Sequence, residues 1–142
     1  MATRNREGAQ AMTQDLVGVW RLEAFHDVDE AGQPVGDGPL GPAPEGMLVY
    51  TSDGHVSVSM MPTRPGPGPS YMGYAGDWWV KGGQVVHHIR ISSRADWVGI
   101  EQTRDAELAG DVLTVRATRE VDARPLRRVL VWRRAEQPGG VR

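Results

Sequence analysis

The feature that most constrains the fold is the two-residue periodicity of the apolar side chains along most of the chain. Short runs rich in Val, Trp, Tyr and Thr are separated by Gly, Pro, Asp and Ser. Successive side chains of a β-strand point to opposite faces, so this alternation is typical of strands with one buried face. The pattern predicts eight strands, at about 17–28, 46–51, 55–61, 71–80, 84–91, 98–108, 111–118 and 125–134. Helix is expected only near residues 10–16.

The segments between these runs predict how the strands are connected. Ser52-Asp53-Gly54, Gly82-Gly83 and Ala109-Gly110 suit tight hairpins, where positive φ is needed. The other connections are longer, and two of them are rich in Pro and Gly. Alternate loops of an up-and-down meander lie at opposite ends, so every tight turn falls at one end. We therefore expect an all-β, eight-stranded antiparallel up-and-down barrel with a closed floor and an open rim.

Length and composition narrow the class of protein. The 142 residues suit a single domain, 1–142, in which we expect 1–12 and 135–142 to be flexible. The absence of cysteine excludes disulfides, thiolate metal sites and cysteine nucleophiles. A formal net charge of −2 gives no field that attracts nucleic acid or an anionic membrane. With no signal-like segment and no run near ~20 apolar residues, a soluble cytoplasmic protein is expected.

Several segments carry a family resemblance. Gly18-Val19-Trp20 resembles the Gly-x-Trp signature of lipocalins. The ordered segments LVGVWRL, GMLVYTSDGHVSVSMM, YMGYAGDWWV, VVHHI, WVGIEQTR and VLVWRR are similar to the bacterial lipocalin-like domain family over about residues 16–134. The resemblance implies a lipocalin-like barrel with a cavity for hydrophobic small molecules. It also implies that Arg134 packs over Trp20 at the floor in a cation–π contact.

Strand alternation assigns side chains to the inside of the barrel. The apolar face of the 98–108 run contains Gln102 and Arg104 at its middle, while its other face is fully polar. No Asp or Glu falls on the inward set, and Tyr50 is expected in the core near the floor. The inward polar residues are His26, Tyr74, His87, Gln102, Arg104 and Arg128. Such a positive, donor-rich lining suits an apolar ligand with a carboxylate or 1,3-dicarbonyl head.

These assignments predict site residues. We expect Arg104 and Gln102 to stabilise an oxyanion, and His87, His26 or Tyr74 to move a proton. The predicted substrate-binding residues are Trp78, Trp97, Met60, Met72, Ile89, Ile100 and Arg128. A structural role stays open for each: a hydrogen-bonded pair for Arg104 and Gln102, core packing for the histidines, Tyr74 and the tryptophans. His87 and His88 point to opposite faces and cannot share an ion, so no metal or cofactor is predicted.

The function predicted from the residues and the resemblance is a cofactor-free cyclase or isomerase. Relatives with similar barrels act as such enzymes in bacterial natural-product pathways, so a polyketide-like pathway is expected. The inward polar residues favour an apolar substrate with a carbonyl or acidic head. The alternative is a non-catalytic carrier for a hydrophobic small molecule, using the same residues. The expected partner is that small molecule, without nucleic acid or membrane, and a homodimer is left open.

Overall fold

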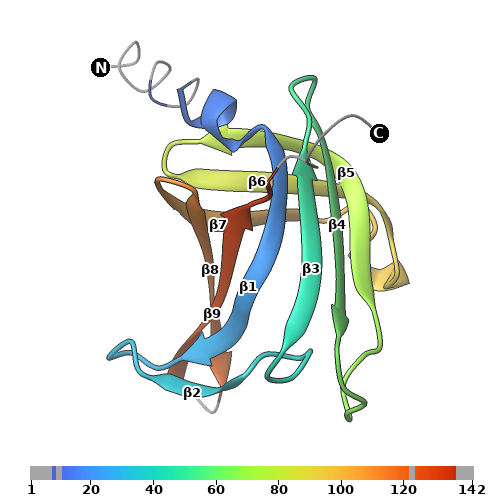
Figure 1. Cartoon of the computed structure of the whole chain (residues 1–142), viewed down its shortest axis with the longest axis vertical. Helices are drawn as coiled ribbons and strands as arrows, with labels where there is room; N and C mark the ends of the chain where they lie inside the picture. Colours follow the sequence, from blue (N-terminus) through green and yellow to red (C-terminus); the bar gives the residue numbers. More distant parts are fainter. Residues whose placement is uncertain (1–7, 9–10, 122–123, 137–142) are drawn as a thin grey trace.

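The structure is a computed structural model that describes residues 8, 11–121 and 124–136. The described residues form nine antiparallel strands in one sheet, ordered β2-β1-β3-β4-β5-β6-β7-β8-β9. β1 also pairs with β9, so the sheet closes into a barrel (Figure 1). Apart from β2, neighbours in the chain are neighbours in the sheet. The predicted eight-stranded up-and-down barrel is confirmed, with one strand added.

The barrel strands follow the predicted runs closely. They are β1 (Gly18–Val28), β3 (Pro44–Tyr50), β4 (His55–Pro62), β5 (Met72–Lys81), β6 (Gln84–Ser92), β7 (Glu101–Ala109), β8 (Val112–Val121) and β9 (Arg124–Arg134). A helix at residues 11–16 precedes β1, and the 3₁₀ helix η1 (Ala95–Trp97) lies between β6 and β7. The ends predicted to be flexible, 1–12 and 135–142, lie largely outside the described residues.

The added strand, β2 (Pro34–Asp37), was not predicted from the sequence. All four of its residues are exposed, so its run has no buried face and no apolar alternation. It forms because β1 pairs with β3 only at its start, from Gly18 to Arg21. Further along, the same edge of β1 is free, and β2 pairs there from His26 to Val28. Backbone hydrogen bonds, rather than side-chain burial, therefore account for this strand.

The connections sort between the two ends of the barrel as predicted. The tight turns contain Gly54, Gly82 and Gly110, all with positive φ between 60° and 94°. They lie at the same end as the helix at 11–16, whereas β2 and the long connections after β1 and β4 lie at the opposite end (Figure 1). The barrel thus has a compact floor and a looped rim.

Trp20 anchors the floor. Its side chain is 0% exposed, and its indole Nε1 donates to the Leu16 carbonyl at 2.9 Å. The Arg134 guanidinium lies 4.3 Å from the centre of the Trp20 ring, which confirms the expected cation–π contact. Arg134 also donates to the carbonyls of Val17 at 3.2 Å and Asp15 at 2.5 Å. One arginine therefore covers the indole and satisfies carbonyls at the end of the helix.

Two structural features explain why glycine occupies position 18 in the Gly-x-Trp signature. Gly18 has φ +134°, in a region that other residues rarely adopt. A Cβ built at Gly18 would lie 3.3 Å from Arg134 Nη1, closer than ordinary packing allows. Glycine therefore lets the arginine reach the helix carbonyls past the start of β1.

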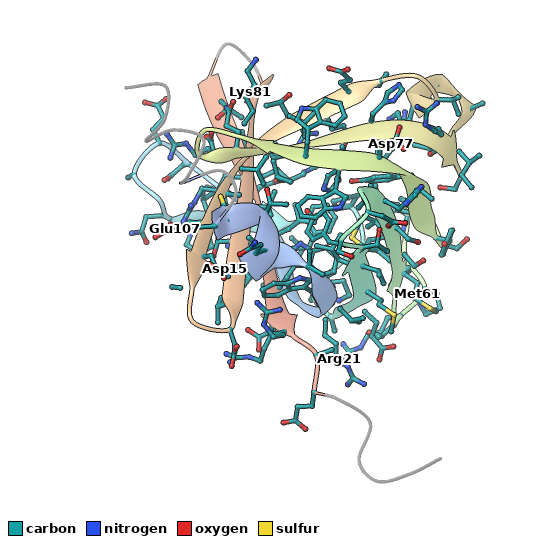
Figure 2. All side chains as sticks on the ribbon, turned by 90° about the horizontal axis from the view of Figure 1, so that it is seen from above. Asp15, Arg21, Met61, Asp77, Lys81 and Glu107 are labelled. Atoms are coloured by element: carbon teal, nitrogen blue, oxygen red, sulfur yellow. The ribbon has the colours of Figure 1, made fainter. Side chains whose placement is uncertain are left out.

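Figure 2 looks onto the end that carries the helix. Asp15 lies on the helix over this end of the barrel. Below it the floor half of the interior is filled by large apolar side chains, among them Trp20, Leu16, Leu48 and Leu113 at no more than 1% exposure. The other labelled residues lie around the outside of the barrel: Arg21, Met61, Asp77, Lys81 and Glu107. Any ligand space must therefore lie between this core and the rim.

The floor contact predicts a measurable loss of stability for Arg134→Ala. The substitution removes a cation–π contact and leaves two carbonyls without their donor, so we expect the free energy of unfolding to fall by about 1–3 kcal/mol. Urea denaturation followed by Trp fluorescence measures it. Arg133→Ala is the matched control, since Arg133 forms an exposed ion pair with Glu23 and the substitution should cost under about 1 kcal/mol. Equal losses for the two variants would contradict the assigned role.

Candidate functional site

A cavity of about 130 Å³ lies inside the barrel above the floor core. Its apolar lining comes from six strands and η1: Phe25, Leu48, Val58, Met60, Met72, Trp97, Val115, Ala117, Leu130 and Trp132. Its polar lining is Tyr50, Tyr74, His87, Gln102, Arg104 and Arg128. A cavity of roughly 150 Å³ holds benzene, whereas drug-sized ligands need at least about 300 Å³. The enclosed space therefore fits a single ring or a short branched chain.

Wider hollows lie on the outer surface of the sheet. One of about 460 Å³ is lined by Thr51, His55, Ala75 and Ile91 among others. It has no buried polar side chain, and Ile91 is 67% exposed there. The internal cavity combines enclosure with buried polar groups, so it is the candidate site.

Most of the predicted site residues meet in this cavity. Eight of the twelve line it: Tyr74, His87, Gln102, Arg104, Met60, Met72, Trp97 and Arg128. Four do not line it: His26, Trp78, Ile89 and Ile100. A bulge in β1, the segment between β6 and β7, and packing at the floor explain these departures.

His26 is displaced by a β-bulge in β1. The register with β9 shifts between Leu22 and Ala24, so β1 holds one extra residue there. Beyond the bulge Phe25, not His26, lines the cavity, and His26 is only partly buried. The prediction that His26 faces the interior was wrong because it assumed unbroken alternation.

Ile100 and Ile89 are displaced by the segment between β6 and β7. The predicted strand 98–108 begins only at Glu101, after η1 and a turn in which Gly99 has φ +89°. Ile100 therefore lies outside the strand and is 43% exposed, contrary to its predicted inward position. Ile89 is fully buried, but its backbone bonds to Gly99 and Ile100 and its side chain does not border the cavity.

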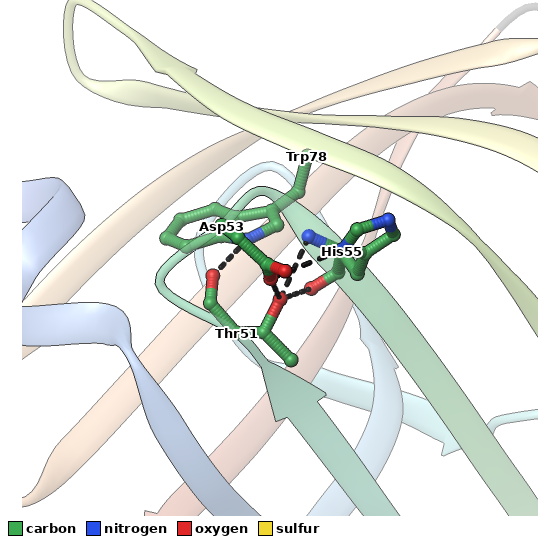
Figure 3. Close-up of polar contacts among 4 residues, drawn as sticks. All are labelled: Thr51, Asp53, His55 and Trp78. Atoms are coloured by element: carbon green, nitrogen blue, oxygen red, sulfur yellow. Dashed lines mark hydrogen bonds and ion pairs between the residues drawn. The ribbon is translucent and has the colours of Figure 1, made fainter.

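Trp78 belongs to the floor instead of the cavity wall. Its Nε1 donates to the Thr51 carbonyl at 3.0 Å, and its ring packs against Tyr50 with 4.2 Å between centroids. Figure 3 shows Trp78 beside the β3–β4 hairpin. In that hairpin Asp53 accepts from Thr51 Oγ1 at 2.5 Å and lies 3.1 Å from His55 Nδ1. The Trp78 ring thus packs against Tyr50, and Tyr50, not Trp78, lines the cavity.

Two tyrosines bracket His87. Tyr50 Oη lies 2.7 Å from His87 Nε2, and Tyr74 Oη lies 2.5 Å from His87 Nδ1. These residues come from β3, β5 and β6, so three strands build the cluster. Tyr50 was expected only in the core. Its membership could have been inferred from the alternation of β3, which places Leu48 and Tyr50 on one face.

Burial keeps the cluster neutral. The pKa of His87 is lowered to about 3, first by burial and then by the nearby positive charge of Arg104. Burial raises the pKa of Tyr74, and Arg104 partly opposes this increase. The pKa of Tyr50 is also raised well above its ordinary value by burial. At neutral pH the imidazole and both phenols are therefore uncharged.

The two arginines of the lining have different partners. Arg128 Nε pairs with Asp27 Oδ1 at 3.2 Å, and its guanidinium lies 5.5 Å from the centre of the Phe25 ring. Arg104 donates to the carbonyl of Thr103 at 3.0 Å. Across the described part of the chain, no carboxylate lies within ion-pair distance of Arg104. Burial and the neighbouring Arg128 both lower the pKa of Arg104, although the guanidinium stays charged.

The ion pair corrects one detail of the predicted lining. No acidic residue was expected on the inward face, yet the bulge that turns Phe25 inward also brings Asp27 to Arg128. The side chain of Asp27 is only 14% exposed. The charge of Arg128 is therefore compensated within the protein. Arg104 carries the positive charge that the cavity presents to a ligand.

Trp97 and Gln102 complete the ligand-facing surface. Trp97 lies edge-on to Tyr74 with 6.2 Å between ring centroids, and the Arg94 guanidinium lies over the Trp97 ring, 4.8 Å from its centroid. Gln102 is the register partner of His87 and lines the cavity two residues before Arg104. The side chains of Tyr74, Gln102 and Arg104 thus offer hydrogen-bond donors to one space.

Metal binding receives no support from the geometry of the histidines. His87 faces the cavity, whereas His88 is half-buried with its Nδ1 3.5 Å from Asp77 Oδ2. Among residues 8, 11–121 and 124–136, no three His, Asp or Glu side chains form a group suited to a metal ion. None of the described helices has the length and apolar character needed to cross a bilayer.

The low pKa of His87 predicts a pH-dependent loss of stability. In the unfolded chain His87 takes up a proton near its ordinary pKa, while the folded protein keeps it neutral down to about pH 3. The contribution of His87 to the free energy of unfolding is therefore complete above about pH 6.5. Below that pH it declines by about 1.4 kcal/mol per pH unit. The measurement is the difference in unfolding free energy between the native protein and His87→Gln from pH 7 to pH 4.

His55 supplies a control, because its contribution to stability changes with pH in the opposite direction. The carboxylate of Asp53 raises the pKa of the exposed His55, so its small contribution is present at low pH and is lost as pH rises. A difference for His87→Gln that stays constant with pH, or follows the direction of His55→Gln, would contradict a buried neutral His87.

Comparison with known proteins agrees with the geometry. A family model described as Lipocalin-like domain matches residues 17–70 and 66–135. A search of curated proteins finds no significant match to this sequence. The family match spans most of the barrel, from the Gly-x-Trp segment of β1 to the arginine of β9 that covers it. Lipocalin-like barrels bind small hydrophobic molecules. The chain belongs to the family of proteins with a Lipocalin-like domain.

Proposed function

We propose that this protein binds a small apolar molecule through a carbonyl or acidic oxygen. The observation that carries the proposal is Arg104, a cavity-lining guanidinium with no described carboxylate partner, beside the phenol of Tyr74. The apolar wall at Met60, Met72 and Leu130 would hold the body of the ligand. Arg104, Tyr74 and Gln102 would hold its oxygen.

Electrostatics favours an anionic or strongly polarised oxygen over other polar groups. A guanidinium that is partly removed from water without a counter-ion is destabilised, as the lowered pKa of Arg104 indicates. A ligand carboxylate or enolate would restore the lost interaction and form charge-assisted hydrogen bonds. A ligand cation would instead meet the uncompensated charge of Arg104 at short range. The site therefore selects for negative charge at the head of the ligand.

Cavity size adds a second restriction. About 130 Å³ accommodates one ring with a small head group, while a longer molecule must extend past the rim. At the rim the two long loops pack closely against each other, since a Cβ at Gly68 would lie 2.2 Å from the Pro39 carbonyl. A polyketide-like substrate would therefore place only its reactive end in the barrel.

The same donors favour a second candidate, a cofactor-free isomerase or cyclase of a natural-product pathway. In enolisation a C–H bond next to a carbonyl breaks, its electron pair becomes the enolate, and the charge moves to the oxygen. Arg104 and Tyr74 would stabilise that charge. His87 cannot serve as the base, because both ring nitrogens are hydrogen-bonded and its pKa is about 3. Water would accept the proton, and the barrel would add positioning of the reacting ends.

Benzoate is a suitable probe for the binding function. Its ring matches the cavity, and its carboxylate can reach Arg104. We expect benzoate to bind the native protein and to bind Arg104→Gln about 10- to 100-fold more weakly, because a charge-assisted hydrogen bond is lost. Isothermal titration calorimetry gives both affinities. Toluene, which lacks the head group, should not lose affinity for Arg104→Gln.

Arg21→Gln is the matched control, because Arg21 is an exposed arginine on the outer face of β1. It should bind benzoate as the native protein does. Benzoate affinity that is the same for the native protein, Arg104→Gln and Arg21→Gln would contradict the proposed site.

Proton exchange distinguishes an enzyme from a carrier. The methyl protons of acetophenone exchange with deuterium through the enolate, and ¹H NMR follows their loss in D₂O. An enzyme should accelerate this exchange over buffer, with a loss of about tenfold or more in Arg104→Gln. A carrier should bind acetophenone and leave its exchange at the rate in buffer, which would exclude the catalytic candidate for this probe.

A further inference from the structure

The hydrogen-bonded chain Tyr50–His87–Tyr74 has a direction that the geometry determines. Its two links are 2.7 Å from Tyr50 Oη to His87 Nε2 and 2.5 Å from His87 Nδ1 to Tyr74 Oη. Tyr50 is 1% exposed and His87 is 7% exposed, so solvent does not compete for either link. The tautomer of His87 determines which atom donates in each link.

Tyr50 has one described hydrogen-bond partner, the imidazole of His87. If Tyr50 accepted from that ring, its own O–H would be buried with no described acceptor. An unsatisfied buried donor costs about 1–3 kcal/mol, more than the difference between the two neutral forms of imidazole in a matched environment. Tyr50 therefore donates, and Nε2 of His87 accepts.

The proton on the imidazole must then lie on the other nitrogen. Neutral imidazole has one N–H and one acceptor nitrogen. Burial and Arg104 keep His87 neutral, so the ring cannot donate from both sides. With Nε2 accepting from Tyr50, Nδ1 carries the hydrogen and donates to Tyr74 Oη. This is the less common tautomer in water, held here by a buried phenol.

The phenol of Tyr74 thereby keeps its own proton for the cavity. Its oxygen accepts from His87, and among the described residues its O–H has no other acceptor. Tyr74 lines the cavity next to Arg104, so its free O–H is directed at the space of the ligand. We infer that Tyr50 is a positioning residue that, through His87, makes Tyr74 a hydrogen-bond donor to an acceptor oxygen of the ligand. This inference rests on the proposed function for its ligand.

The chain also determines ligand specificity. Tyr74 donates while it accepts from His87, and successive hydrogen bonds in one direction strengthen each other. Arg104 is a donor in every state. The site thus selects ligands whose polar atom accepts at least two hydrogen bonds, such as a carboxylate, an enolate or a ketone. A group that can only donate, such as an ammonium, finds no acceptor on Tyr74 or Arg104.

The tautomer of His87 can be measured directly, without any ligand. Two-bond ¹H–¹⁵N correlation spectra of the imidazole rings separate the two neutral tautomers, and His87→Gln assigns the signals among the four histidines. At pH 7 we expect His87 to show the Nδ1–H form alone. The Nε2–H form in the native protein would overturn the inference, whatever the binding results are.

Tyr50→Phe tests the positioning role. The ring that packs against Trp78 stays, and only the hydroxyl is lost. We expect the Nε2–H form of His87 to become populated beside the Nδ1–H form, because loss of the Tyr50 donor removes the preference for an accepting Nε2. In molecules with the Nε2–H form, Tyr74 turns its O–H to Nδ1. Benzoate affinity should fall by about 3- to 10-fold. Toluene affinity should stay as it was.

Tyr71→Phe is the matched control. Tyr71 is 50% exposed on the outer face, where its hydroxyl bonds to Ser59 at 3.2 Å. It should change neither the His87 spectrum nor benzoate binding. An unchanged tautomer in Tyr50→Phe with native affinity for benzoate would overturn the inference. If Tyr50→Phe does not fold, the native spectrum alone decides. If benzoate fails to bind the native protein, the proposed function fails, while the tautomer still tests the chain.

Discussion

The pairing of β1 with β9 is the constraint on which the rest of the structure depends. It closes the sheet and leaves the barrel without open edges along these strands. In its register Trp20 lies opposite Arg134, and Asp27 lies opposite Arg128. The first pair forms the floor and ties the preceding helix to it. The second compensates one of the two lining arginines. A single ladder therefore sets both the closed end of the barrel and the charge left in its cavity.

Much of the fold could be predicted from the sequence, because strand periodicity and turn chemistry are local. Eight runs of alternating residues correspond to the eight barrel strands, and glycines at the tight turns indicated which end is closed. The strand β2 could not be found this way, since it has no buried face and exists through an edge that β1 leaves free. Its cause lies in the pairing of other strands, not in its own residues.

The candidate site was predicted where alternation is unbroken and missed where it is not. β7 keeps a strict alternation from Glu101 to Ala109, and Gln102 and Arg104 both line the cavity. The bulge in β1 exchanges His26 for Phe25, and the η1 segment removes Ile100. The role of His87 depends on Tyr50 and Tyr74 from two other strands, which no spacing in the sequence connects. Contacts of this kind depend on three-dimensional register.

The bulge has a further consequence for how this barrel tolerates change. β9 alternates regularly, and its residues Arg128, Leu130 and Trp132 all line the cavity. β1 pairs with it by means of one extra, unpaired residue between Leu22 and Ala24. Which side chains of β1 face inward is therefore decided by their partners in β9, not by counting along β1. Deleting Glu23 would shorten the strand and return it to plain alternation, with Phe25 and Asp27 still facing inward. The register with β9, and not the number of residues in β1, therefore determines which side chains of β1 form the cavity wall.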